Sequence, residues 1–113
     1  MIDFACKKIE LNDVIRCSFD LTKSDLKIMF FLFNNSSLTS SEISSELSLD
    51  LSTIQRSLKR LYKKDIVRRN QKNLEKGGYV YEYEINSKNE IKNRIINIIE
   101  DWKDNVEKEL KKI

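Results

Sequence analysis

The sequence predicts a small, mainly α-helical domain that carries one β-hairpin. Apolar residues recur at helical spacing along most of the chain, and one short stretch alternates them at strand spacing. Helix breakers are scarce, because the chain has no proline and its two glycines are adjacent, at Gly77 and Gly78. A length of 113 residues suits a single domain. We expect this domain to have three parts in chain order: an N-terminal helix over 1–20, a core over 21–86 and a C-terminal helix over 87–113.

Three helices are predicted in the first half of the chain. The segment from Ile2 to about Arg16 shows an imperfect helical period. A second helix follows Thr22 and Asp25, a pair that loosely resembles a capping box. It is apolar on nearly all sides, so it should lie at the centre of the fold. A third, short helix begins at the T-x-x-E capping box formed by Thr39 and Glu42.

A basic amphipathic helix should follow almost at once, with Asp50 as its N-cap and an end near Lys64. Its apolar stripe consists of four residues at helical spacing: Leu51, Ile54, Leu58 and Leu61. Rotation by 100° per residue places six polar residues on the opposite side: Ser52, Thr53, Arg56, Lys59, Arg60 and Lys63.

A β-hairpin is predicted directly after this helix. Asp65 tolerates the left-handed conformation that ends many helices. Residues 66–71 fit a first strand, and 79–85 alternate tyrosine and isoleucine with other residues as a half-buried strand does. Lys72 to Gly78 would form the tip.

The last helix is predicted to outrun the domain core. Ser87 and Glu90 form another capping box, and about 25 residues follow, which span nearly 40 Å. Its stripe contains Ile91, Ile95, Ile99 (or Ile98), Trp102, Val106, Leu110 and Ile113. An exposed apolar patch of that size usually marks an interface. We expect a homodimer through the N- and C-terminal helices, the alternative being that the last helix folds back along its own domain.

The basic residues concentrate in the middle of the chain. Two short helices joined by a brief turn outline a helix-turn-helix, and the hairpin after them would be the wing of a winged helix. From Leu51 to Lys76 there are nine basic residues and two acidic ones, a net charge of +7, whereas the whole chain carries +3. The remainder is therefore at −4. Such asymmetry favours a polyanionic partner.

Double-stranded DNA is the expected partner. Arg and Gln can read guanine and adenine edges, and Ser, Thr and Lys reach phosphates. The expected DNA-binding residues are Ser52, Thr53, Gln55, Arg56, Lys59, Arg60, Lys63, Arg68, Arg69, Lys72 and Lys76. Two alternatives remain open: the basic face is merely solvated, or it binds an acidic protein as an interaction module.

An enzymatic function is disfavoured. The chain has no histidine, and Cys6 and Cys17 are too few for a structural zinc site. No glycine-rich phosphate loop occurs, so we expect no cofactor and no metal. We expect the two thiols to be buried, with a disulfide between subunits as the alternative. No apolar run is long enough to cross a membrane, and no secretory signal is visible, so a cytoplasmic protein is expected.

The segment LTSSEISSELSLDLSTIQRSLKRLYKKDIVRR, with GGYVYEYEI after it, resembles the winged helix-turn-helix of MarR-like and TrmB-like transcriptional regulators, the latter common in archaea. The resemblance covers about Leu21 to Ile85. It implies a homodimer with one recognition helix per half-site, in which Ser52, Thr53, Gln55 and Arg56 fall where the family contacts DNA. Asp65 replaces the usual glycine. The extra sugar-binding domain of larger TrmB proteins has no counterpart, so no effector is implied.

Overall fold

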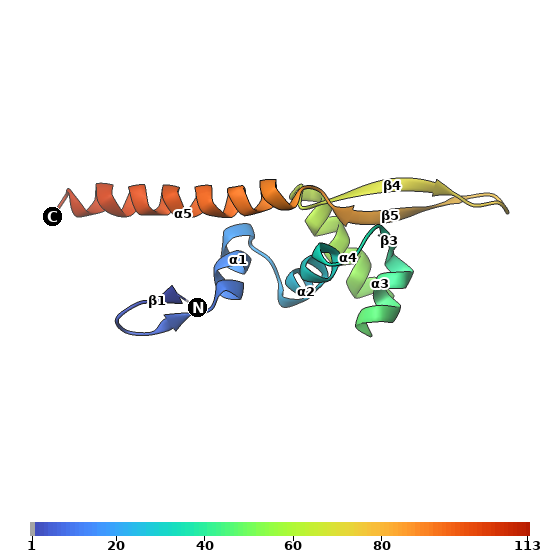
Figure 1. The fold of residues 1–113 in the computed structure, drawn as a ribbon, viewed down its shortest axis with the longest axis horizontal. Helices are drawn as coiled ribbons and strands as arrows, with labels where there is room; N and C mark the ends of the chain where they lie inside the picture. Colours follow the sequence, from blue (N-terminus) through green and yellow to red (C-terminus); the bar gives the residue numbers. More distant parts are fainter. Residues whose placement is uncertain (1) are drawn as a thin grey trace.

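The computed structural model describes residues 2–113, which form five helices and two small antiparallel sheets (Figure 1). The helices are α1 (Leu11–Phe19), α2 (Lys23–Phe33), α3 (Ser40–Leu47), α4 (Leu51–Lys63) and α5 (Lys88–Leu110). The strands are β1 (Ile2–Asp3), β2 (Lys8–Ile9), β3 (Leu38–Thr39), β4 (Val67–Asn73) and β5 (Tyr79–Ile85). β1 pairs with β2, and the other sheet has the order β3-β5-β4. The predicted mainly α fold with a winged helix-turn-helix is confirmed.

α2 lies at the centre of the core, as its apolar character predicts. Ile28, Met29 and Leu32 of this helix are almost completely buried. α4 packs against α2 and α3 through its apolar stripe, of which Ile54 and Leu61 are fully buried. Because this stripe faces inward, the polar side of α4 faces solvent.

Local hydrogen bonds fix where the helices of the core begin. The capping boxes Thr22–Asp25 and Thr39–Glu42 are both complete, with a backbone N–H donated to each hydroxyl and to each carboxylate. The carboxylate of Asp50 accepts the backbone N–H of Thr53 at the start of α4. The predicted caps at Thr22, Thr39 and Asp50 are confirmed. Each of them satisfies a helix N–H that otherwise has no partner.

The wing is the hairpin of β4 and β5, which pair along their whole length from Val67 opposite Ile85 to Asn73 opposite Tyr79. The turn contains Gly77 and Gly78, both with positive φ, at 92° and 79°. Such values are accessible to glycine without steric cost. The third strand, β3, was not predicted.

The predicted helix from Ile2 to Arg16 is wrong over its first half. Residues 2–9 form the β1–β2 hairpin, with Ile2 opposite Ile9, and α1 begins only at Leu11. The backbone N–H of Phe4 donates to the Lys7 carbonyl at 2.9 Å and closes the turn. Ile2 and Phe4 lie two residues apart, which is strand spacing, and this explains the imperfect helical period.

The thiols of Cys6 and Cys17 are exposed and free. Cys6 lies in the bend of the β1–β2 hairpin, and Cys17 lies on the solvent side of α1. The expectation of buried thiols is therefore wrong.

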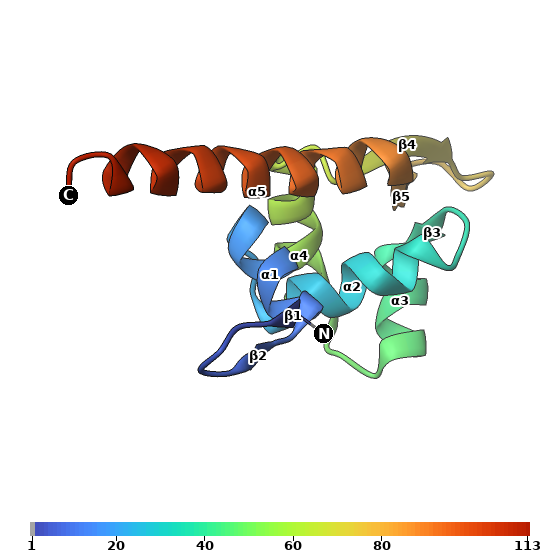
Figure 2. The ribbon, with the colours of Figure 1, turned by 60° about the vertical axis from the view of Figure 1, so that its left-hand side comes forward.

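The molecule is elongated, with extents of 67 × 23 × 21 Å, because α5 runs away from the body (Figures 1 and 2). α1 packs against the start of α5, where the Arg94 guanidinium lies over the Phe19 ring at 4.8 Å. Ile91 is buried in the core, whereas the Trp102 and Leu110 side chains are 59% and 58% exposed. The wing tip and the end of α5 point in opposite directions.

Candidate nucleic-acid interface

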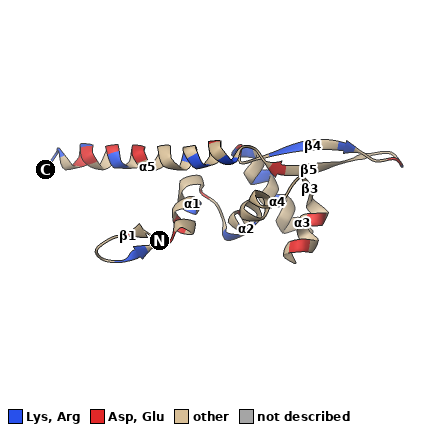
Figure 3. Cartoon of the chain, viewed as in Figure 1, with Lys and Arg blue, Asp and Glu red and all other residues tan. Residues whose placement is uncertain are grey.

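The solvent face of α4 presents an uninterrupted row of basic side chains. Ser52, Arg56, Lys59 and Lys63 are exposed, and Gln55 is exposed beside them. Within residues 2–113, no carboxylate forms an ion pair with Arg56, Lys59 or Lys63. Arg56 donates only a long hydrogen bond, of 3.5 Å, to the Thr53 hydroxyl. This side of α4 therefore keeps its positive charge available for a partner. Figure 3 shows that basic residues also occur on β4 and at the start of α5, and that acidic residues appear toward the C-terminal end of α5.

The hydroxyls of Ser52 and Thr53 are engaged at the helix start. Both donate to the carboxylate of Asp50, Thr53 at 2.7 Å. These two hydrogen bonds, with the one from the Thr53 backbone, lower the pKa of Asp50 to about 2 from its ordinary value of 3.8. Ser52 and Thr53 thus lie on the predicted face, but their protons are already donated within the cap.

The cap makes a testable contribution to stability at acidic pH. Because the pKa of Asp50 is lowered in the folded state, its carboxylate stabilises the fold above about pH 4 and loses this effect as the pH falls to about 2. We expect the Asp50→Asn variant to lack this part of the acid dependence. Denaturant unfolding at stepped pH measures it for both proteins. Equal slopes of unfolding free energy against pH in the two proteins would contradict the assignment.

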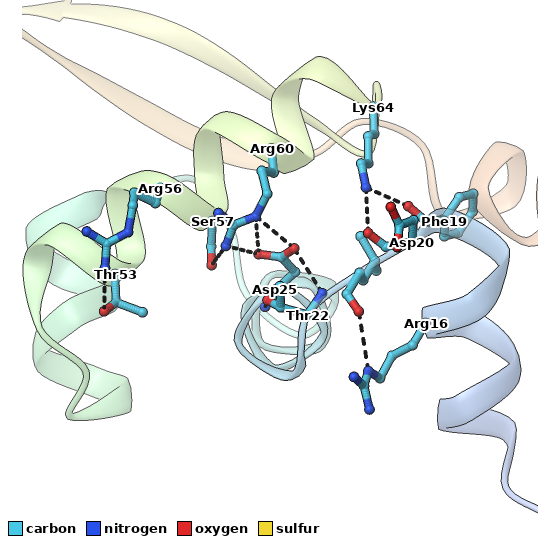
Figure 4. A network of polar contacts seen from close by, with 11 residues as sticks. Arg16, Phe19, Asp20, Thr22, Asp25, Thr53, Arg56, Ser57, Arg60 and Lys64 are labelled. Atoms are coloured by element: carbon cyan, nitrogen blue, oxygen red, sulfur yellow. Dashed lines mark hydrogen bonds and ion pairs between the residues drawn. The ribbon is translucent and has the colours of Figure 1, made fainter.

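Arg60 points away from the exposed face and into the body. Its Nη2 lies 2.9 Å from Oδ1 of Asp25, and its Nε donates to both carboxylate oxygens at 3.1 and 3.2 Å (Figure 4). The Asp25 side chain is completely buried. Burial alone would raise the pKa of Asp25, but hydrogen bonds from Arg60, Ser57 and the Thr22 backbone outweigh it and hold the pKa below its usual value. Most of the charge of Arg60 is therefore balanced inside the fold.

The wing divides its basic residues among different environments. Arg68 donates to the Glu84 carboxylate at 2.7 Å, and this hydrogen bond is the main cause of the lowered pKa of Glu84. Arg69 has no carboxylate partner among the described residues and stacks on tyrosines instead. Lys72, on β4, and Lys76, in the turn, are both exposed.

Lys64 is also bound internally. Its ammonium donates to the carbonyls of Phe19 and Asp20, at 2.7 and 2.6 Å, and so caps the end of α1 (Figure 4). Lys64, Arg60 and Arg68 all contribute to the +7 charge of the segment while being satisfied by the protein itself. The charge count from sequence therefore overstates what α4 and the wing offer to a partner.

The described part of the chain contains neither a cluster of metal ligands nor a helix suited to cross a membrane. Residues 2–113 bring no three Cys, Asp or Glu side chains together in a way that would hold a metal ion. None of the helices is long and apolar enough to span a bilayer.

Comparison with known proteins places the chain in a family. Residues 9–106 match the family model of the DnaD N-terminal domain. The chain belongs to this family. The uncharacterized protein MJ1503 of Methanocaldococcus jannaschii is 30% identical to this DnaD N-terminal domain over 103 residues, which cover 91% of this chain and 78% of the relative.

Solved structures share the fold of this DnaD N-terminal domain. A possible transcriptional regulator from Methanosarcina mazei Go1 is 47% identical, with a TM-score of 0.90 over 99% of this chain and 95% of that one. MarR superposes with a TM-score of 0.58 at 20% identity, over 87% of this chain and 73% of its own. The latter likeness concerns the fold alone, and it confirms the winged helix-turn-helix resemblance.

Proposed function

We propose that this DnaD N-terminal domain binds double-stranded DNA as a homodimer, recognises specific sequences and regulates transcription. The observation that carries the proposal is the exposed side of α4, where Arg56, Lys59 and Lys63 form no ion pair within residues 2–113 and lie beside a basic wing. The description of the similar Methanosarcina mazei protein as a possible transcriptional regulator supports it.

The arrangement suits the major groove. Helix-turn-helix proteins insert the N-terminal part of the second helix, and here that part exposes Gln55 and Arg56. These side chains would read base edges, while Lys59 and Lys63 farther along α4 would bind phosphates. Lys72, on the wing, would bind the backbone beside the groove. Arg60 and Arg68 are left out of this proposed interface, because carboxylates already hold them.

The homodimer is proposed from α5. Its stripe is continuous with the core at Ile91 but uncovered from Ile98 onward, where Trp102, Val106 and Leu110 are exposed. A second copy of the same stripe would bury these side chains, as an isologous two-fold contact does.

Selection of bound duplexes from a random pool tests the proposal. We expect palindromic sequences, with half-sites about 34 Å apart or a multiple of that distance. The logarithm of the affinity should fall with the logarithm of salt concentration, by about 0.9 per phosphate contacted. Absence of salt-dependent binding would overturn the proposal and favour the protein-interaction module.

Two variants separate reading of sequence from binding of the backbone. Arg56→Ala should weaken operator binding by about 1–3 kcal/mol and relax the sequence preference, because a base contact is lost. Lys72→Ala should weaken operator and unrelated duplexes alike and reduce the salt dependence. Fluorescence anisotropy with both duplexes measures the two effects. Unchanged operator binding by Arg56→Ala would show that α4 does not read the bases.

A further inference from the structure

Arg69 contacts two aromatic rings that come from different elements. Its guanidinium carbon lies 4.3 Å from the centre of the Tyr62 ring on α4 and 4.4 Å from the centre of the Tyr81 ring on β5. These distances are typical of cation–π contacts. The stack joins the C-terminal part of α4 to the wing.

Tyrosine rings surround the contact, and no carboxylate of residues 2–113 forms an ion pair with Arg69. Arg69 faces Tyr83 across the hairpin, on the side of the sheet that continues from buried Val67 and Ile85. The Tyr81 ring meets its neighbours Tyr79 and Tyr83 edge to face, at 5.4 and 6.5 Å. By strand alternation, Glu82 and Glu84 lie on the other side of the hairpin, where Glu84 binds Arg68.

A stacked guanidinium leaves its edges available. Arg carries five N–H donors in the plane of the group, and contacts of the guanidinium carbon with ring centres at 4.3 and 4.4 Å are not hydrogen bonds to these donors. Among the described residues Arg69 forms no ion pair, and its side chain is exposed. The planar fork matches a phosphate, which accepts two parallel hydrogen bonds. The rotamer entropy that an exposed Arg loses on binding is reduced, because the stack already orders the side chain.

We propose that Tyr62 and Tyr81 are positioning residues that hold Arg69 for contact with one DNA backbone phosphate, in the corner between α4 and the wing. The inference rests on the proposed function and adds to it one phosphate contact, made by Arg69. Since the same stack fixes the wing to α4, the two elements meet the duplex as one unit. A phosphate is favoured over a base edge, because Arg69 contacts Tyr62 in the C-terminal part of α4, away from the N-terminal part of the helix that is proposed to read the bases.

A double-mutant cycle on the full chain tests the positioning role. In fluorescence anisotropy with one duplex, Arg69→Ala should weaken binding about tenfold and lower the salt slope by about 0.9 for each half-site. Tyr62→Leu and Tyr81→Leu, which leave the charge unchanged, should each weaken binding about threefold to tenfold. Neither should weaken it further in the Arg69→Ala background. Tyr62→Phe and Tyr81→Phe keep the rings and should restore binding, whereas Arg69→Lys keeps the charge without the planar fork and should not.

The outcomes separate the inference from the function on which it rests. If the unmodified protein binds no duplex in a salt-dependent way, the proposed function fails. If it binds and Arg69→Ala leaves the affinity and the salt slope unchanged, the phosphate contact is refuted while the function stands. If Tyr62→Leu weakens binding equally with and without Arg69, the positioning role is refuted. Thermal unfolding of each variant shows whether a loss reflects the fold rather than the contact.

Discussion

Arg60→Ala should lower the free energy of unfolding by about 3 kcal/mol, because it leaves the buried carboxylate of Asp25 without its cation. Removal of one partner from a buried ion pair costs roughly 3–5 kcal/mol, and the lower end applies since the Arg60 side chain is 39% exposed. The pair joins the start of α2 to α4 across 35 residues of chain. Urea unfolding followed by circular dichroism measures the loss.

The double variant Asp25→Asn/Arg60→Met is the matched control. It removes both charges, so it should be more stable than Arg60→Ala alone. The dependence of stability on acidic pH is a second measurement. Because the pKa of Asp25 is lowered in the folded state, the ion pair stabilises the fold above the ordinary carboxyl pKa, and this stabilisation is lost as the pH falls through the lowered pKa. The double variant should lack that dependence. If Arg60→Ala lowered the free energy of unfolding no more than replacement of an exposed lysine by alanine does, the Arg60–Asp25 pair would not be what holds α4 against α2.

Trp102→Glu should convert the protein to a monomer. Trp102 lies in the middle of the exposed apolar stripe of α5, and a charge there would have to be buried in the proposed dimer. Aromatic residues at such positions commonly contribute 2 kcal/mol or more to association, about a thirtyfold change in the dissociation constant. Sedimentation equilibrium over a concentration series measures the change. DNA binding should weaken in parallel, because one half-site would be bound at a time.

Asn97→Glu provides the control for this variant. It introduces the same charge on α5, but rotation by 100° per residue places Asn97 on the side opposite Trp102. This variant should remain a dimer. Dissociation of both variants, or of neither, would contradict an interface formed by the stripe.

Periodicity and caps in the sequence were sufficient to predict the core of the fold. The boxes at Thr22 and Thr39, the N-cap at Asp50 and the left-handed Asp65 depend on neighbours within four residues, so the local pattern contains the information. The β1–β2 hairpin and β3 consist of two-residue strands, which are too short for a period to be recognised. β3 also ends at Thr39, whose place in the T-x-x-E pattern predicts a helix cap and gives no sign of a strand.

The candidate site was harder to predict, because its charges depend on distant residues. Sequence places Arg60 on the polar side of α4, but it does not show that Asp25 neutralises it. One signal was available: Asp25 is an acid in a helix that is apolar on nearly all sides, and a buried acid requires a cation. The stack of Arg69 on Tyr62 likewise depends on how the wing returns toward α4, which no local pattern encodes.

The uncovered length of α5 separates the part of the molecule proposed to pair from the part proposed to bind DNA. The two surfaces share no residue and lie toward opposite ends of a molecule 67 Å long. Each turn added to this helix would lengthen it by about 5.4 Å, roughly one and a half base-pair steps. In the proposed dimer, the length of α5 would therefore set the distance between the two DNA-binding surfaces, and a longer or shorter helix would suit half-sites at a different spacing.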